Sequence, residues 1–190
     1  MILNLDFYLR DDVITIAKEL IGKWLMTNIN GKVTGGMITE TEAYRGPEDR
    51  ASHAYRNRRT SRNEVMFHQG GISYVYLCYG IHHLFNVVTN KMNQPHAVLI
   101  RAIDPTDGLD EIKQRRNLSH SNAPLISGPG TVTQALGINL DHNGLCLTNS
   151  FIWIEDRKNK SLEIMATPRI GIDYAKEDAA LPWRYVLKPS

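Results

Sequence analysis

An acid, an imidazole and several flat aromatic rings fall close together in this sequence. The segment Glu40-Thr41-Glu42-Ala43-Tyr44 is followed by His53 and by the tyrosine-rich run Tyr74-Val75-Tyr76-Leu77-Cys78-Tyr79-Gly80. A carboxylate can activate water, aromatic rings can stack on a planar heterocycle, and a tyrosine beside a glycine can project from a tight turn. This combination suggests chemistry on a flat, stackable substrate such as a nucleobase.

Arginines crowd the stretch that follows the acidic segment, although the net charge of the chain is only +2. They are Arg45, Arg50, Arg56, Arg58, Arg59 and Arg62. Such a local cluster can bind phosphates even when the protein as a whole is not strongly basic. A solvated loop whose arginines pair with nearby carboxylates explains the same stretch equally well.

Length and composition predict one domain over residues 1–190, because 190 residues with 42% hydrophobic content can bury a full core. The two cysteines, Cys78 and Cys146, are too few for a disulfide framework and lack metal-ligand spacing. We therefore expect the protein to be located in the reducing cytoplasm. The first residues do not resemble an export signal, and no apolar run approaches the roughly 20 residues that span a bilayer. We therefore expect no membrane role.

Two elements are predicted to carry the acidic segment and its support. With Asp11 or Asp12 as the cap, helical spacing of apolar residues predicts an amphipathic helix that packs on a sheet. Its apolar residues are Val13, Ile14, Ala17, Leu20, Ile21, Trp24 and Leu25. The strand expected over Gly36 to Tyr44 would place Ile38, Glu40, Glu42 and Tyr44 on one face. Glu42 and Tyr44 can then share a pocket wall.

A long surface loop is expected from Gly46 to Asn63, and a β-hairpin from the strands 72–79 and 81–89. Tyr79 would lie at the hairpin tip. If the turn is centred near Ile81, Tyr76 lies across from Asn86.

A further strand is expected over residues 97–103, in which Arg101 lies among apolar neighbours. An arginine there usually has a partner, and Glu42 is the obvious candidate. Helices are expected over 107–117 and from Gly128-Pro129-Gly130 to Leu136; the amides at that second N-terminus could hold a phosphate, although Gly-Pro-Gly is more often a simple turn. The expected fold class is mixed α/β (α+β), with a curved, mostly antiparallel sheet, flanking helices and a protruding hairpin.

The run from Thr39 to Asp49 and the ordered residues after it closely resemble the alkyladenine (3-methyladenine) DNA glycosylase family, which includes the mammalian N-methylpurine glycosylase. The matching residues continue through His53, Thr60, Arg62-Asn63, Met66-Phe67, Tyr74-Val75-Tyr76, Tyr79-Gly80, Asn86, Arg101, Ser127-Gly128-Pro129, Gln134-Ala135-Leu136, Arg169-Ile170-Gly171 and Trp183-Arg184-Tyr185. The match covers nearly the whole chain with similar spacing, as expected for a bacterial member.

This resemblance implies a base-excision-repair enzyme that flips a damaged purine out of duplex DNA and hydrolyses its bond to deoxyribose. The lesions implied are 3-methyladenine, 7-methylguanine, hypoxanthine and ethenoadenine. Tyr79 matches the tyrosine that intercalates into the vacated space. Tyr44 matches a stacking platform, and His53 and Tyr76 match the residues on the other face of the flipped base.

The resemblance also assigns the groups that act on the glycosidic bond. Glu42 matches the general base for the attacking water, Arg101 matches the arginine that holds this carboxylate, and the backbone near Ile170 matches a further water contact. The arginine should keep Glu42 ionised. Asn86 matches the residue at the pocket floor that excludes normal guanine by a clash with its exocyclic amine, and Glu40 drops to a supporting role.

No lysine matches a Schiff-base nucleophile, so a monofunctional glycosylase is expected. No metal or organic cofactor is implied, and His82-His83 do not form a metal site. The expected partner is double-stranded DNA with damaged purines, bound by a monomer in the cytoplasm at the nucleoid. Two alternatives remain: a non-catalytic nucleic-acid-binding module of the same fold, which the pairing of Glu42 with Arg101 disfavours, and a small-molecule nucleoside hydrolase, for which Tyr79 and the arginine loop would be unnecessary.

Overall fold

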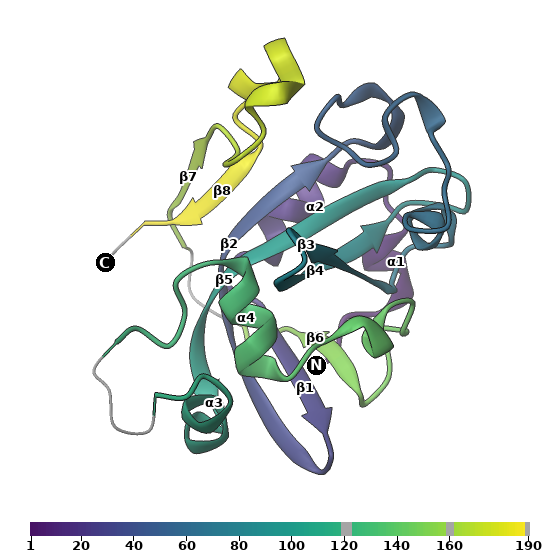
Figure 1. The fold of residues 1–190 in the computed structure, drawn as a ribbon. Coiled ribbons are helices and arrows are strands. Elements are labelled where there is room, and N and C mark those ends of the chain that lie inside the picture. The colour runs from purple at the N-terminus through teal and green to yellow at the C-terminus, as the bar shows by residue number, and fades with distance from the viewer. Residues whose placement is uncertain (119–122, 159–161, 189–190) are drawn as a thin grey trace.

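The computed structural model describes residues 1–118, 123–158 and 162–188, and these residues form a mixed α/β fold around one open antiparallel sheet (Figure 1). Its eight strands are β1 (Trp24–Ile29), β2 (Lys32–Tyr44), β3 (Ser73–Cys78), β4 (His82–Thr89), β5 (His96–Asp107), β6 (Ile152–Glu155), β7 (Ile164–Thr167) and β8 (Arg184–Leu187). The helices are α1 (Leu5–Tyr8), α2 (Val13–Leu20), α3 (Leu109–Arg115) and α4 (Pro129–Leu136). The predicted fold class is confirmed.

The long strand β2 organises the sheet, whose main order is β3-β4-β5-β2-β1-β6. One edge of β2 pairs with β5, and the other pairs first with β1 and then, towards the end of β2, with β8. In Figure 1 the yellow strand β8 accordingly runs beside the end of β2, with β7 on its outer side. This arrangement brings the last part of the chain next to Glu42, which pairs with Arg184.

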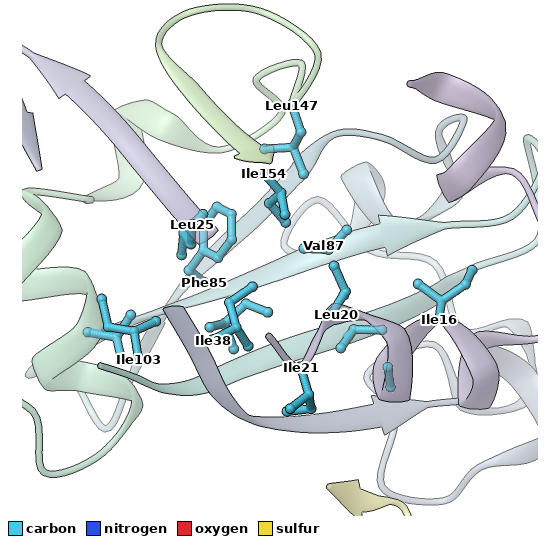
Figure 2. Packing of buried hydrophobic residues seen from close by; sticks show 14 of the residues in the cluster. Ile16, Leu20, Ile21, Leu25, Ile38, Phe85, Val87, Ile103, Leu147 and Ile154 are labelled. Carbon is cyan, nitrogen blue, oxygen red and sulfur yellow. The ribbon is translucent and has the colours of Figure 1, made fainter. Parts of the chain in front are cut away.

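The sheet has one apolar face, and the helices α2 and α4 contribute to the core packed on it. Figure 2 shows Ile16 and Leu20 of α2 against side chains from the strands. Alternate residues of three neighbouring strands point into this core: Val75, Phe85, Val87, Val98 and Ile100. Because side chains alternate along a strand, the residues between them face the other side, where they line a cavity.

The strands β2 and β5 each contain an irregularity at the same level of the sheet, so the side chains of β2 do not alternate as the sequence predicted. The pairing passes from Ile38 opposite Ile103 to Glu40 opposite Ala102, and then to Thr41 opposite Ile100. One residue is therefore inserted on each strand, Thr39 on β2 and Arg101 on β5, and each insertion reverses the faces beyond it. Ile38 and Ala43 both lie in the core, so Ile38 does not share a face with Glu42.

The helix predicted to run as far as Leu25 is shorter than expected. It begins after Asp12, whose carboxylate accepts a hydrogen bond from the Ile14 amide (3.0 Å), and it ends at Leu20. Gly22 has a φ of 82°, a left-handed conformation that commonly ends a helix. Trp24 and Leu25 therefore belong to β1, and their apparent helical spacing is coincidental.

The remaining predicted elements are present with changed bounds. Residues 46–63 contain only short 3₁₀ turns, as expected for a long loop, and the predicted helices correspond to α3 and α4. The turns in this loop are Gly46–Glu48 and Tyr55–Asn57, and further 3₁₀ turns lie at Glu64–Phe67, Leu140–His142 and Asp173–Ala180. No helix in the described part of the chain has the length and apolar character needed to cross a membrane.

The β3–β4 hairpin is present, but its register differs from the prediction. Tyr74 pairs with Asn86 and Tyr76 pairs with Leu84, because the turn is centred on Gly80 rather than on Ile81. A shift of two residues keeps every side chain on its face, so Tyr76 and Asn86 still line the same cavity. At the tip, Tyr79 and Gly80 both have positive φ angles, 51° and 72°, and the Ile81 amide donates to the Cys78 carbonyl (3.1 Å).

This turn generates a stability prediction for Tyr79. A positive φ is a left-handed conformation that Asn and Gly tolerate, whereas a bulky aromatic side chain such as that of Tyr79 is strained there. Tyr79 is also 89% exposed, so its ring contributes little packing. We expect Tyr79→Asn to leave the free energy of unfolding in urea unchanged or raised by up to about 1 kcal/mol. A loss of stability would contradict this account of the turn.

Candidate active site

A cavity of about 730 Å³ lies on the face of the sheet opposite the core. This volume is in the range of about 300–1,000 Å³ that is common for small-molecule sites. Its floor is formed by β2, β3, β4 and β5, and one wall by the loop 45–63, called here the arginine loop. The hairpin tip, the segment 127–131 at the start of α4 and the segment 170–174 complete its lining.

Glu42 lies in this cavity with no exposure to solvent. Its Oε1 atom accepts a hydrogen bond from the backbone amide of Ile170 (2.8 Å), and its Oε2 atom accepts one from the Tyr44 hydroxyl (2.8 Å). The Nη1 atom of Arg101 lies 3.6 Å from Oε1. The structure therefore brings together four of the residues singled out in the sequence, and it orients both oxygens of the carboxylate.

Burial nevertheless raises the pKa of Glu42 above its ordinary value. Arg101, the Ile170 amide and the Tyr44 hydroxyl each lower this pKa, but they do not outweigh the loss of solvation, and Glu40 raises it further. We expected Arg101 to keep Glu42 ionised; Arg101 does lower this pKa, but the net direction is upward because the effect of burial is larger. A raised pKa makes the ionised carboxylate a stronger base, as proton abstraction from water requires.

Glu40 is the closer partner of Arg101, a second correction to the sequence analysis. The Nε atom of Arg101 donates to Glu40 Oε1 at 2.8 Å, and Arg184 Nε donates to the same oxygen at 2.6 Å. Arg184 also donates to the Thr167 hydroxyl (3.0 Å). Glu40 thus holds Arg101 beside Glu42 and connects β2 to β8.

The aromatic rings of His53, Tyr74 and Tyr76 lie together in the lining of the cavity. The ring of His53 meets Tyr76 edge-on, with 4.7 Å between centroids, and Tyr74 lies tilted against Tyr76 at 5.3 Å. The His53 Nδ1 atom is hydrogen-bonded to the Tyr74 hydroxyl (2.8 Å). Tyr44 lines the same cavity, so planar side chains from β2, β3 and the arginine loop are present in one site.

His53 is held in its neutral form. Burial, with a smaller contribution from the positive charge of Arg62, lowers the pKa of His53 to about 4. The guanidinium of Arg62 stacks over Tyr76, 5.2 Å from its centroid. The imidazole consequently adds no positive charge to the cavity near neutral pH.

Asn86 and Tyr79 both line the cavity but differ sharply in exposure, at 3% and 89%. Asn86 is buried in the floor, where its Nδ2 atom donates to the Tyr74 carbonyl (3.1 Å), and this bond fixes the side chain against β3. Tyr79 projects from the hairpin tip at the mouth, beside Ile81, which is 73% exposed. An exposed aromatic and an exposed aliphatic side chain on one tight turn form an apolar wedge.

The arginine loop contains both paired and unpaired charges. Arg50 is paired with Glu177 and Arg59 with Glu64, as the solvated-loop interpretation predicted. Arg56 and Arg58, in contrast, have no carboxylate partner among the described residues. The solvated-loop interpretation therefore holds for Arg50 and Arg59, whereas phosphate binding by the other arginines stays a prediction.

The described residues contain no group of three or more histidine, cysteine, aspartate or glutamate side chains arranged to hold a metal ion. Sequence reasoning overlooked Arg62 as a cavity residue and Arg169 as a buried one. Arg62 gave no local signal, because it lies in an irregular loop. Tyr74 could have been found from its period-two spacing to Tyr76, which places both rings on one face.

The raised pKa of Glu42 predicts a gain in stability when its charge is removed. A carboxyl whose pKa is higher in the folded than in the unfolded chain destabilises the fold once pH exceeds the unfolded value, about 4.3. We therefore expect Glu42→Gln to unfold a few degrees higher than the unmodified protein at pH 8, and the difference to disappear near pH 4. Thermal unfolding at pH 4, 6 and 8 measures it, with the 80%-exposed Glu163 changed to Gln as the control. A less stable Glu42→Gln at pH 8 would contradict the assigned direction.

Comparison with known proteins identifies the family. The family model described as methylpurine-DNA glycosylase (MPG) matches residues 6–190. A protein of Chlamydia felis is 54% identical over 182 residues, which are 95% of this chain and 93% of the relative. Relatives from Chlamydia pneumoniae and Bacillus cereus (strain G9842) are 50% and 43% identical, over 96% and 93% of this chain and 93% and 91% of their own lengths. All three are named, as provisional assignments, 3-methyladenine DNA glycosylases. The chain belongs to the methylpurine-DNA glycosylase family, and its enzyme class is that of a DNA glycosylase.

Proposed function

We propose that this protein removes damaged purines from duplex DNA by hydrolysing the N-glycosidic bond, and that it acts as one monomeric glycosylase unit over residues 1–190. The observation that carries the proposal is Glu42: a fully buried carboxylate, hydrogen-bonded at both oxygens, on the floor of an aromatic cavity. Burying a charge is costly, and phosphate binding gains nothing from it. A water-activating base does gain, because its basicity rises.

In the proposed reaction, Glu42 orients a water molecule and accepts its proton as the oxygen attacks the sugar carbon C1′. The bond between C1′ and the base breaks, and its electron pair leaves with the base. The negative charge of Glu42 also stabilises the positive charge that develops on the sugar. Arg101 and the Ile170 amide hold Oε1, so that the carboxylate does not rotate away from the water.

The cavity favours a flipped purine, including a positively charged one. Tyr44 on one side and Tyr76 with His53 on the other can sandwich a flat heterocycle, at about 1–3 kcal/mol for each stacking contact. His53 is neutral near pH 7, so it does not repel the cationic bases that alkylation produces. Asn86 on the floor would disfavour normal guanine through a clash with its exocyclic amine.

The mouth of the cavity fits a DNA duplex from which one nucleotide has been extruded. Tyr79 would enter the gap left in the helix, which offsets part of the unstacking cost of a few kcal/mol. Arg56 and Arg58, which lack carboxylate partners among the described residues, can neutralise phosphates nearby. Among the described residues, the cavity lining contains no lysine, which supports hydrolysis by water without a Schiff base and hence without strand cutting.

The test uses duplexes that carry 3-methyladenine, 7-methylguanine, hypoxanthine or ethenoadenine. We expect the protein to release free base and leave sites that break only in alkali. Glu42→Gln should bind the lesion duplex with similar affinity but release base at least about 100-fold more slowly, since the general base is lost. Glu163→Gln serves as the charge-matched control. Binding without base release from any lesion would instead support the non-catalytic module.

The hairpin tip generates a separate prediction. Tyr79→Asn keeps the turn but removes the ring that would fill the gap, so we expect the preference for lesion over undamaged duplex to fall by about tenfold or more, or roughly 1.4 kcal/mol. Competition binding with matched duplexes measures this preference. Because the same variant is expected to be at least as stable as the unmodified protein, a loss of preference would not reflect unfolding. Unchanged discrimination would exclude Tyr79 from this role.

A further inference from the structure

Behind the cavity lies an ion pair that is completely buried. Arg169 and Asp49 have no side-chain exposure, and their two contacts are 2.5 Å (Nη1 to Oδ2) and 2.9 Å (Nη2 to Oδ1). Arg169 also donates to the carbonyl of Ala43 at 2.9 Å and to that of Asp178 at 3.3 Å. It therefore joins the end of β2, the arginine loop and the segment after β7.

Stability alone is a poor explanation for this pair. Two buried charges lose their hydration, and well-packed apolar residues are often at least as stabilising in the same place. The Nε atom of Arg169 is also buried without a hydrogen-bond partner among the described residues, which adds to the cost. An arrangement of this kind is better explained by what it positions.

Arg169 supports both groups that donate hydrogen bonds to Glu42. The amide that binds Oε1 belongs to Ile170, the next residue in the chain. The hydroxyl that binds Oε2 belongs to Tyr44, whose ring lies against the Arg169 guanidinium, 4.9 Å from carbon to centroid. Trp183 lies against the same guanidinium at 5.1 Å. The Arg169 side chain thus helps to position the hydrogen-bond donor of each Glu42 carboxylate oxygen.

The positive charge of the Arg169 guanidinium affects how well the cavity binds a charged base. Tyr44 lines the cavity and Arg169 does not, so a base stacked on Tyr44 lies on the other side of the ring. With a stacking distance of roughly 3.5 Å, the base is about 8 Å from the guanidinium. At that distance in a partly desolvated site, an uncompensated positive charge repels a cationic base appreciably.

We infer that Arg169 is a positioning residue for Glu42 and Tyr44, and that Asp49 neutralises it so that the Tyr44 platform accepts positively charged bases. The inference rests on the proposed function. Asp49 thereby sets the balance between cationic and neutral lesions, although it lies behind the platform and touches neither the base nor the sugar.

The test compares release of cationic 3-methyladenine from methylated duplex DNA with release of neutral hypoxanthine from a deoxyinosine duplex. Both are measured in single turnovers with enzyme in excess, and the ratio of the two rates is the readout. A purely structural role would slow both reactions alike and leave the ratio unchanged. We expect Asp49→Asn to lower the ratio by about tenfold, because it leaves Arg169 uncompensated. Arg169→Gln, which leaves a negative charge instead, should raise the ratio while slowing both reactions.

Asp107→Asn is the control, since it removes a carboxylate from a partly exposed pair with Arg157 outside the cavity lining, and it should leave the ratio unchanged. A ratio that falls in both Asp49→Asn and Arg169→Gln, or that is unchanged in Asp49→Asn, would overturn the inference. If Asp49→Asn does not fold, as judged by near-ultraviolet circular dichroism, the Arg169→Gln ratio decides: a rise supports the inference and any other result overturns it. Failure of the unmodified protein to release either base would instead overturn the proposed function.

Discussion

The carboxylate of Glu42 is fully buried and therefore needs hydrogen-bond donors and a positive charge beside it, and several distant parts of the structure provide them. A charge without solvent must be held by hydrogen bonds and opposite charge, and here the donors come from β2 itself, from β5 and from the segment after β7. No single stretch of chain could supply all three. The strand β2 brings these donors together because β5 pairs along one of its edges and β8 along the other, so that distant segments of the chain lie side by side near its end.

The same sheet separates apolar packing from polar chemistry. Val75, Phe85 and Val98 face the core, whereas their neighbours Tyr76, Asn86 and Leu99 face the cavity. The paired insertions of Thr39 and Arg101 maintain this separation, because both strands change faces together and Ile38 and Ile103 return to the core. They also place Arg101 between two carboxylates, Glu40 and Glu42, which a regular ladder would not do.

Local patterns were sufficient to predict the features set by neighbours in sequence. The Asp12 cap, the hairpin with Tyr79 at its tip and the shared face of Tyr76 and Asn86 follow from spacing and turn chemistry. The ends of the helix at Gly22, the insertions in β2 and β5, and the hairpin register depend on backbone angles and on partner strands, which spacing does not encode. The direction of the Glu42 pKa and the Asp49–Arg169 pair were equally inaccessible, since burial and a contact across 120 residues arise only in the folded chain.

The contact between Ile170 and Glu42 also sets an order of events during synthesis. These residues are separated by 128 positions, so the ribosome must extend the chain far beyond β5 before the Ile170 amide can donate to Glu42 Oε1. Until then the strands β1 to β5 can already be in place, with Tyr44 and Arg101 beside the carboxylate but without the backbone amide of Ile170. The backbone donor of this fully buried carboxylate therefore becomes available only after most of the chain has been synthesised.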